Sequence, residues 1–223
     1  MRSYDEILQI AEDRKGSREA VLKDMPKILS SDDLAGIPGN LWLSCMARGI
    51  FQAGISWRVV ENKWPGIEEA FFGFDLGRCA FMDEDWFEAL LNDRRIIRAA
   101  PKIRAIQQNA VFIQEVSAEH GSFGQRVGDW PVSDFAGLLA WLKTSGSRLG
   151  GVTGAYMLRV MGKEGYILSA SVLARLIEEA VIDKAPTSAR AMRAVQEAFN
   201  IWQAQSNESL TTISRVLAQS IDP

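Results

Sequence analysis

Apolar residues recur at helical spacing along most of this 223-residue chain. Spacings of three and four residues place side chains on one face of an α-helix, whereas a half-buried strand shows strict alternation. No convincing alternating segment occurs in the sequence, so we predict an all-α protein. The clearest stripes are Leu8 with Ala11; Leu41, Cys45 and Ile50 or Phe51; Ile103, Ile106, Ala110 and Ile113; Val172 to Val181; Met192 to Trp202; and Leu210, Ile213 and Leu217.

Short segments rich in Pro, Gly and Ser separate these stripes. They lie at residues 37–39, 64–66, 120–122, 130–131, 145–147 and 185–188. No linker, repeat or low-complexity tract was found, and a hydrophobic content of 47% is enough for a sizeable core. We therefore expect residues 1–223 to form a single compact domain with two helical lobes.

The chain contains no apolar run long enough to cross a membrane, and its first residues lack the apolar stretch of a secretion signal. This predicts a soluble, cytoplasmic protein. Cys45 and Cys79 lie in apolar helical surroundings without a paired C-x-x-C spacing, which favours buried free thiols over a disulfide or a metal site.

Conventional hydrolase residues are scarce. His120 is the only histidine and precedes Gly121 at a predicted helix end, where a capping role is the simpler interpretation. The acidic pairs lie within helical surface patterns, and neither cysteine has a ligand neighbour in the sequence. The sequence therefore assigns no catalytic residue, no metal and no cofactor.

A glycine turn at Leu149-Gly150-Gly151-Val152-Thr153-Gly154 leads directly into an apolar helical run at 155–161. Glycines allow positive backbone dihedrals and close approach, and the first amides of a helix are free to bind an anion. Residues 135–163 also contain four basic residues and no acid. The turn is therefore a candidate phosphate-binding element.

A second acid-free basic run, from Arg94 to Arg104, contains five basic residues. A solvated helix surface is the alternative for either run alone. The formal net charge of −3 argues against broad attraction to polyanions but allows a local basic face. Two such runs together with the glycine turn favour nucleic acid.

The segment Phe51-Gln52-Ala53-Gly54-Ile55-Ser56-Trp57 combines two aromatic rings with an amide. Gly54 interrupts a helix and Ser56 can cap the next one. Such a set can stack on an extruded base and read its edge. The alternative is that Phe51 and Trp57 belong to the core.

Together these segments resemble the 3-methyladenine DNA glycosylase I family, within the helix-hairpin-helix glycosylase superfamily. The resemblance rests on residues 52–57, on Ile96-Ile97-Arg98 with Lys102-Ile103 and Asn109-Ala110, and on the glycine turn. It implies a bilobal all-α fold and the removal of alkylated purines, chiefly 3-methyladenine, from double-stranded DNA after base flipping. No obligate protein partner is implied.

The resemblance also implies roles for particular residues. Base binding falls to Trp57, which would stack on the base, and to its neighbours Gln52, Phe51 and Ser56. Binding of a DNA phosphate falls to Gly150, Gly151, Thr153, Gly154 and Arg148. The zinc ligands found in many members of the family have no counterparts, so no metal is expected.

At two places the sequence differs from the family's pattern. The pocket carboxylate falls at Gly49, and the aspartate that follows the hairpin helix in the superfamily falls at Ser169 or Ser171. Asp32 or Asp33 could fold back to fill the pocket. One alternative function is a DNA-binding or lesion-sensing homologue without catalysis. A helical interaction protein is another, and it predicts that the two basic runs lie on different faces.

Overall fold

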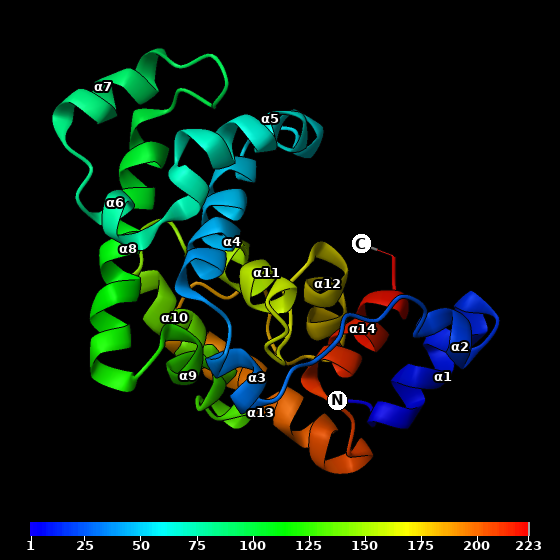
Figure 1. Ribbon diagram of the computed structural model, residues 1–223. Coiled ribbons are helices and arrows are strands. Elements are labelled where there is room, and N and C mark those ends of the chain that lie inside the picture. Colours follow the sequence, from blue (N-terminus) through cyan, green and yellow to red (C-terminus); the bar gives the residue numbers. More distant parts are fainter. Residues whose placement is uncertain (223) are drawn as a thin grey trace. The chain divides into compact units, whose positions relative to one another are not determined.

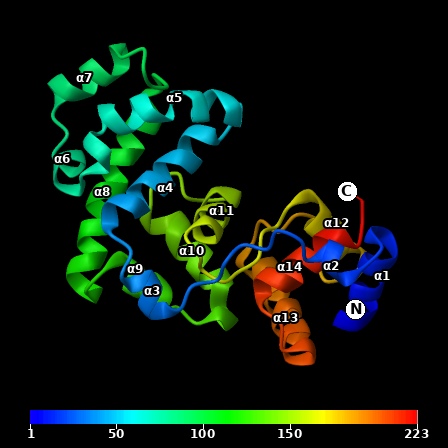
Figure 2. The ribbon, with the colours of Figure 1, turned by 45° about the vertical axis from the view of Figure 1, so that its right-hand side comes forward.

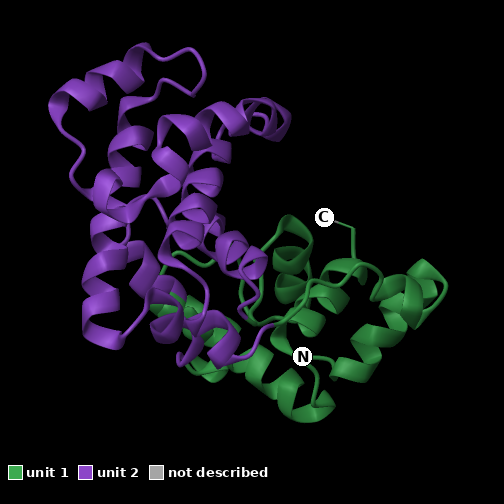
Figure 3. Cartoon of the chain, in the orientation of Figure 1, with its two compact units in different colours: residues 1–28, 131–138, 164–223 green, residues 29–130, 139–163 purple. Residues whose placement is uncertain are grey.

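The computed structural model describes residues 1–222, and over this range every regular element is a helix (Figure 1). The all-α prediction is confirmed. The chain divides into two compact units, residues 1–28, 131–138 and 164–223 forming unit 1 and residues 29–130 and 139–163 forming unit 2 (Figure 3). Each unit thus combines segments that lie far apart in the sequence.

Unit 1 contains both ends of the sequence. Its elements are α1 (Tyr4–Lys15), α2 (Arg18–Val21), η2 (Val132–Asp134), the first residues of α10 (Phe135–Ser145), α12 (Ala170–Glu178), α13 (Ala189–Ser206) and α14 (Leu210–Gln219). Helix α14 packs against α1 and α12 (Figure 2). The Tyr166 ring stacks on Phe199 at 4.3 Å between centroids, and the indole N–H of Trp202 donates to the carbonyl of Arg2 at 3.0 Å. The hydrogen bond of Trp202 connects the beginning of the chain to α13.

Unit 2 contains all the residues to which the sequence assigns base or phosphate binding. Its elements are α3 (Ser31–Ala35), α4 (Gly39–Gln52), α5 (Trp57–Ala70), η1 (Phe72–Phe74), α6 (Leu76–Ala80), α7 (Glu84–Asn92), α8 (Ala100–His120), α9 (Phe123–Gly128), the remainder of α10 and α11 (Val152–Val160). The long helix α8 packs against α4, α6 and α9, and α11 packs against α4 (Figures 1 and 2). Helix α8 therefore forms the centre of this unit.

Three details of the helical pattern differ from expectation. Helix α5 continues through Pro65 and Gly66. Glycine is favoured at position 66 because an added Cβ would lie 2.8 Å from the Cβ of Arg95. Leu41 was expected in the core but is exposed on α4. Helix α12 ends at Glu178 and is followed by Ala180 at φ +55°, so the apolar stripe extends beyond the helix. Within residues 1–222, each helix is too short or too polar to span a bilayer.

Candidate base-binding and nucleic-acid site

A tight turn separates α4 from α5 and positions Trp57 as the first residue of α5. Gly54, at φ +75°, allows the chain to reverse there. The ammonium group of Lys102 on α8 donates to the carbonyls of Phe51 at 3.0 Å and Ala53 at 2.6 Å. Because the last carbonyls of a helix lack partners within it, Lys102 stabilises the end of α4. This lysine of the second basic run therefore has a structural role.

The indole of Trp57 is 61% exposed, which is unusual for so large an apolar side chain. Its one close aromatic neighbour in the described chain is Tyr156 on α11, in an edge-to-face contact with 6.4 Å between ring centroids. An edge-to-face partner leaves room on the indole face for another ring. Trp57 is therefore an exposed aromatic residue, and it contacts the helix that follows the glycine turn.

Gln52 lies beside a charged pair. Its amide donates to one carboxylate oxygen of Glu61 at 3.1 Å, and the other oxygen of Glu61 pairs with Arg48 at 3.3 Å. The guanidinium of Arg48 also lies over the Trp64 ring at 4.3 Å. Sequence reasoning missed Glu61, although its spacing of four residues from Trp57 places both side chains on one face of α5.

The other two residues assigned to base binding lie in different environments. Phe51 is 0% exposed and packs against Phe71 in the core, so its ring is not available to a base. This corrects the assignment, and the physical reason is that Phe51 faces the inner side of α4. Ser56 is exposed at the N-cap position of α5, but its side chain makes no capping hydrogen bond.

The hairpin segment, residues 146–151, connects α10 to α11. Gly151 is the N-cap of α11 at φ +62° and ψ −136°, a region of backbone space used almost only by glycine. No side chain caps the first-turn amides of α11. Gly151 and Arg148 are both exposed, whereas Gly150 is half-buried against the stem of Lys143. The hairpin segment thus presents backbone amides and a guanidinium on the surface.

The hairpin segment is held in place by Asn109 on α8 and by the burial of its own residue Leu149. Leu149 is buried, and the buried side chain of Asn109 accepts from the amide of Ser147 at 2.8 Å and donates to its carbonyl at 2.9 Å. The sequence signal for this role was a polar residue on the buried stripe of α8. A side-chain amide that satisfies both backbone groups of one residue holds that backbone in one orientation.

Two residues assigned to phosphate binding are used in packing. Gly154 is buried, and an added Cβ there would lie 2.5 Å from the carbonyl oxygen of Leu149. Glycine at this position lets α11 lie close to the hairpin segment, and its phosphate-binding role stays a prediction that concerns its backbone amide in the first turn of α11. Thr153 is half-buried, and its methyl group lies against Gly49 of α4.

The same contact concerns Gly49, the position at which the pocket carboxylate is missing. A Cβ at Gly49 would lie 3.1 Å from Cγ2 of Thr153, so a side chain there would require Thr153 to shift by a few tenths of an ångström. Asp33 does not fill this place, since its carboxylate forms a capping box with Ser30 on α3. In unit 1, the hydroxyl of Ser169 caps α12 by accepting from the amide of Val172 at 3.3 Å.

Most of the basic run at 94–104 is engaged in local contacts. Arg95 pairs with Asp93 and Glu69, and Arg104 pairs with Glu84. Arg94 and Arg98 instead line a groove of about 760 Å³ together with residues of α5 and its preceding turn. The groove is lined by Ile55, Val59, Lys63, Leu91, Arg94, Ile96, Ile97 and Arg98. Basic residues surrounding an apolar floor suit a polyanion with aromatic or aliphatic parts.

The two basic runs approach each other at Lys102 and Arg148. Burial lowers the pKa of Lys102, and the positive charge of Arg148 lowers it further. The two residues therefore interact electrostatically within unit 2, and the expectation of the interaction-protein alternative, that the runs lie on different faces, stays a prediction.

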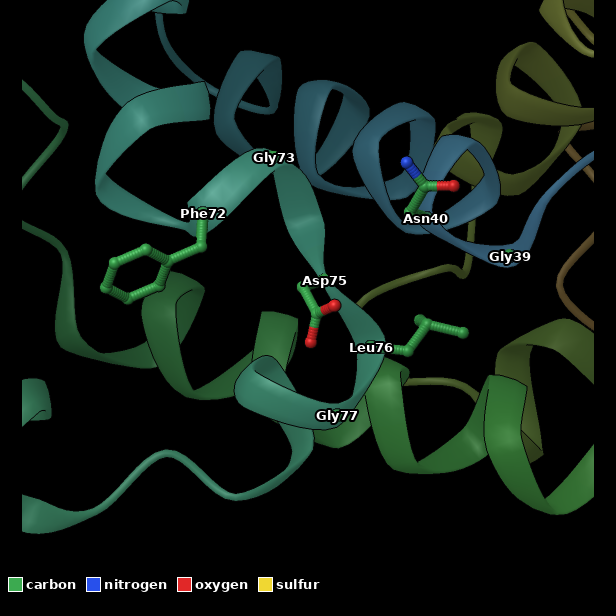
Figure 4. Close-up of a pocket in the computed structure, with 7 residues that line it drawn as sticks. All are labelled: Gly39, Asn40, Phe72, Gly73, Asp75, Leu76 and Gly77. Carbon is green, nitrogen blue, oxygen red and sulfur yellow. The ribbon is translucent and has the colours of Figure 1, made fainter.

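A second cavity, of about 390 Å³, lies at the N-terminal end of α4 (Figure 4). Asp75 lines it, but its carboxylate accepts from the amide of Arg78 as the cap of α6. Gln52 is at the other end of α4, about 20 Å away along a helix of 14 residues. The cavity is therefore separate from the base-binding residues. Its lining is Gly39, Asn40, Phe72, Gly73, Asp75, Leu76 and Gly77.

The remaining candidates for chemistry are structural. Cys45 and Cys79 are free, as predicted, and burial raises the pKa of each thiol to about 12. His120 is the last residue of α8, before Gly121 at φ +87°. Among residues 1–222, no group of three or more His, Cys, Asp or Glu side chains is arranged to hold a metal ion.

Comparison with known proteins shows which family part of this chain resembles. The family model described as methyladenine glycosylase matches residues 41–133. A crystal structure of a 3-methyladenine DNA glycosylase I has 26% sequence identity and a TM-score of 0.50, over 64% of this chain and 86% of that chain. The match to the family model includes the turn with Trp57 and the part of α8 with Asn109, whereas the hairpin segment lies beyond it.

Two further solved structures share the fold. The 3-methyladenine DNA glycosylase I from Staphylococcus aureus is 23% identical with a TM-score of 0.50, over 64% of this chain and 82% of that chain. A variant 3-methyladenine DNA glycosylase I in complex with 3-methyladenine is 22% identical with a TM-score of 0.51, over 66% of this chain and 88% of that chain. The chain is therefore similar to the methyladenine glycosylase family over residues 41–133 and shares its helical fold with the solved 3-methyladenine DNA glycosylase I structures.

Proposed function

We propose that this protein removes alkylated purines such as 3-methyladenine from duplex DNA by hydrolysing the N-glycosidic bond of a flipped nucleotide. The observation that carries the proposal is the contact between Trp57 and Tyr156. It joins an exposed stacking ring to the helix whose first turn has the geometry of a phosphate-binding site. One strand of DNA can therefore be held at its backbone while a base leaves the duplex beside it.

Base binding rests on Trp57 and Gln52. Stacking of a base on an aromatic ring is worth roughly 1–3 kcal/mol, and it does not require a particular base. The Gln52 side chain supplies an amide near the ring, although its N–H is donated to Glu61 in this structure. An alkylated base also pairs poorly, which reduces the cost of extruding it.

Phosphate binding rests on Gly151, the amides that follow it and Arg148. The positive end of α11 and its first amides attract an anion, and the exposed Arg148 adds a charge. These contacts are independent of base sequence. They position DNA of any sequence and leave selection to the base-binding residues.

The chemistry is compatible with a site that has few acid–base groups. An adenine methylated at N3 carries a positive charge while it is attached to the sugar. When the bond between C1′ and the base nitrogen breaks, the electron pair goes to the base, which leaves as a neutral molecule. Water adds to C1′ and releases a proton to the solvent. No general acid is needed for the leaving group.

A second candidate function is lesion binding without excision. The observations that favour it are Gly49, which supplies no carboxylate and lies against Thr153, and Ser169, whose hydroxyl caps α12. A hydroxyl supplies no negative charge to a developing oxocarbenium ion. Such a protein would keep Trp57 and the hairpin segment and would bind alkylated DNA tightly.

Incubation with methylated duplex DNA and chromatography of the released bases distinguishes the two candidates. Release of free 3-methyladenine above the spontaneous rate supports the glycosylase. Salt-sensitive, lesion-selective binding without release supports the lesion-binding protein. Absence of DNA binding at low salt contradicts both.

A further inference from the structure

We infer that Glu61 selects positively charged bases over neutral ones. The inference rests on the proposed function, since it concerns the base that stacks on Trp57. The carboxylate of Glu61 accepts a hydrogen bond from the Gln52 amide and forms an ion pair with Arg48. Nothing in the sequence pattern had assigned it a role.

The position of Glu61 follows from helix geometry. It lies four residues after Trp57 on α5, so the two side chains project from the same face, one turn apart. Gln52, from the last turn of α4, donates to Oε1 of Glu61 and thereby fixes the orientation of the carboxylate. A base stacked on Trp57 would lie within reach of this negative charge.

Arg48 occupies the second oxygen of Glu61 and is held there weakly. The pair has a separation of 3.3 Å, and the side chains are 41% and 46% exposed. Exposed ion pairs contribute little to stability, so Glu61 can exchange Arg48 for another cation at small cost. Arg48 keeps a second partner in the Trp64 ring at 4.3 Å. A cationic base can replace the guanidinium at Oε2, whereas a neutral base offers no charge to compensate for its loss.

Other carboxylates of α5 are less well placed. Glu69 pairs with Arg95. Glu68 lies on the same face as Glu61 but about 10 Å further along the helix axis. This spacing makes Glu68 a matched control, because it carries the same charge on the same helix at a greater distance from Trp57.

The test uses Glu61→Gln, which keeps an oxygen acceptor for the Gln52 amide and removes the charge. Binding is measured with two duplexes, one carrying the 2′-fluoro nucleotide of 3-methyladenine, which is cationic and resists cleavage, and the other carrying neutral 3-deaza-3-methyladenine. We expect Glu61→Gln to weaken binding of the cationic duplex about 10- to 100-fold and of the neutral duplex less than about twofold. Glu61→Asp should retain most of the preference, and Glu68→Gln should leave both affinities unchanged.

The outcomes separate the inference from the function on which it rests. Equal effects of Glu61→Gln on the two duplexes, or no effect on either, overturn the inference and leave the proposed function standing. If the unaltered protein binds neither lesion duplex more tightly than undamaged DNA, both are overturned. Thermal unfolding of each variant shows whether a loss of binding comes from loss of the fold.

Discussion

At the scale of single residues, exposure decides which side chains are available for binding. Phe51 and Trp57 lie six positions apart in one motif, yet Phe51 is completely buried and Trp57 is largely exposed. The difference arises because Phe51 lies on the inner face of α4 and Trp57 begins a new helix after the turn. Within this motif, the exposed indole is the aromatic ring that a flipped base can reach.

Replacement of Trp57 by alanine tests its role directly. We expect Trp57→Ala to lower kcat/KM for release of 3-methyladenine about 10- to 100-fold, because one stacking contact is lost. Binding of undamaged duplex should change less than about threefold. Phe81→Ala is the matched control, since Phe81 is an even more exposed aromatic residue, 85% exposed, that makes none of these contacts. A similar loss of excision and of nonspecific binding would contradict the role.

Arg48 gives a prediction of opposite sign. Its guanidinium neutralises Glu61 and repels a cationic base, so Arg48→Gln should increase the preference for the cationic over the neutral duplex about two- to tenfold. The same binding measurement checks this. A decrease in preference would show that Arg48 contributes attractive contacts to the base.

At the scale of elements, the hairpin segment and the turn before α5 are both held by α8. Asn109 binds Ser147 in the hairpin segment, and Lys102 binds the end of α4. The two residues lie seven positions apart on one helix, so α8 fixes the position of the hairpin segment relative to the turn before α5. Both were visible in the sequence as parts of the family resemblance, but their roles depend on partners remote in the sequence.

Asn109→Ala removes both contacts to the hairpin segment. We expect a loss of about 1–3 kcal/mol in the free energy of unfolding, because the amide and carbonyl of Ser147 lose their partner. Urea denaturation measures this. Gln108→Ala, at an exposed neighbouring position on α8, should have little effect on stability. Equal stabilities of the two variants would show that Asn109 does not stabilise the hairpin segment.

Gly151 tests the phosphate-binding role of α11. Gly151→Asp should weaken binding to duplex DNA of any sequence by about tenfold or more, because it adds a negative charge at the helix start and strains the backbone. Gly151→Ala introduces the strain without the charge, and open space surrounds the position. The difference between the variants therefore measures the electrostatic part. Retention of full DNA affinity in Gly151→Asp would place the phosphate elsewhere.

At the scale of the whole molecule, the buried thiol of Cys79 and the buried phenol of Tyr4 predict that the folded protein loses stability at alkaline pH. Burial raises the pKa of Cys79 from 9.0 to about 12, and burial likewise raises that of Tyr4 from 10.0 to about 12. In the unfolded chain these groups ionise at their ordinary pKa values. Their contribution to stability is therefore fully present below about pH 9 and is lost as the pH rises toward 12.

This dependence can be measured by urea unfolding at pH 7, 9 and 10. The free energy of unfolding should fall by about 1–2 kcal/mol between pH 7 and 10 through Cys79 alone. The Cys79→Ala variant should show a shallower decline over the same interval. Identical declines in the two proteins would mean that the thiol ionises equally in both states. Alkylation of either cysteine in the folded protein should also be slow at pH 8, because little thiolate is present.

The helical fold class and the local geometry of the two motifs follow from the sequence alone. Helical periodicity, the glycine turn and the chain reversal at Gly54 depend on neighbours along the chain, and such short-range preferences can be read directly. The resemblance to the methyladenine glycosylase family also followed from local motifs, and the family model and the solved structures confirm it.

Contacts between side chains of different helices become visible in the folded chain alone. The contact of Thr153 with Gly49, the pairing of Asn109 with Ser147 and the cluster of Arg48, Gln52 and Glu61 each join different helices. Periodicity gives the face of a helix but not the partner that covers it, because packing depends on the crossing of helices and on side-chain volumes. For that reason the sequence indicated an empty carboxylate position at Gly49, whereas the folded chain places a carboxylate, Glu61, on the neighbouring helix.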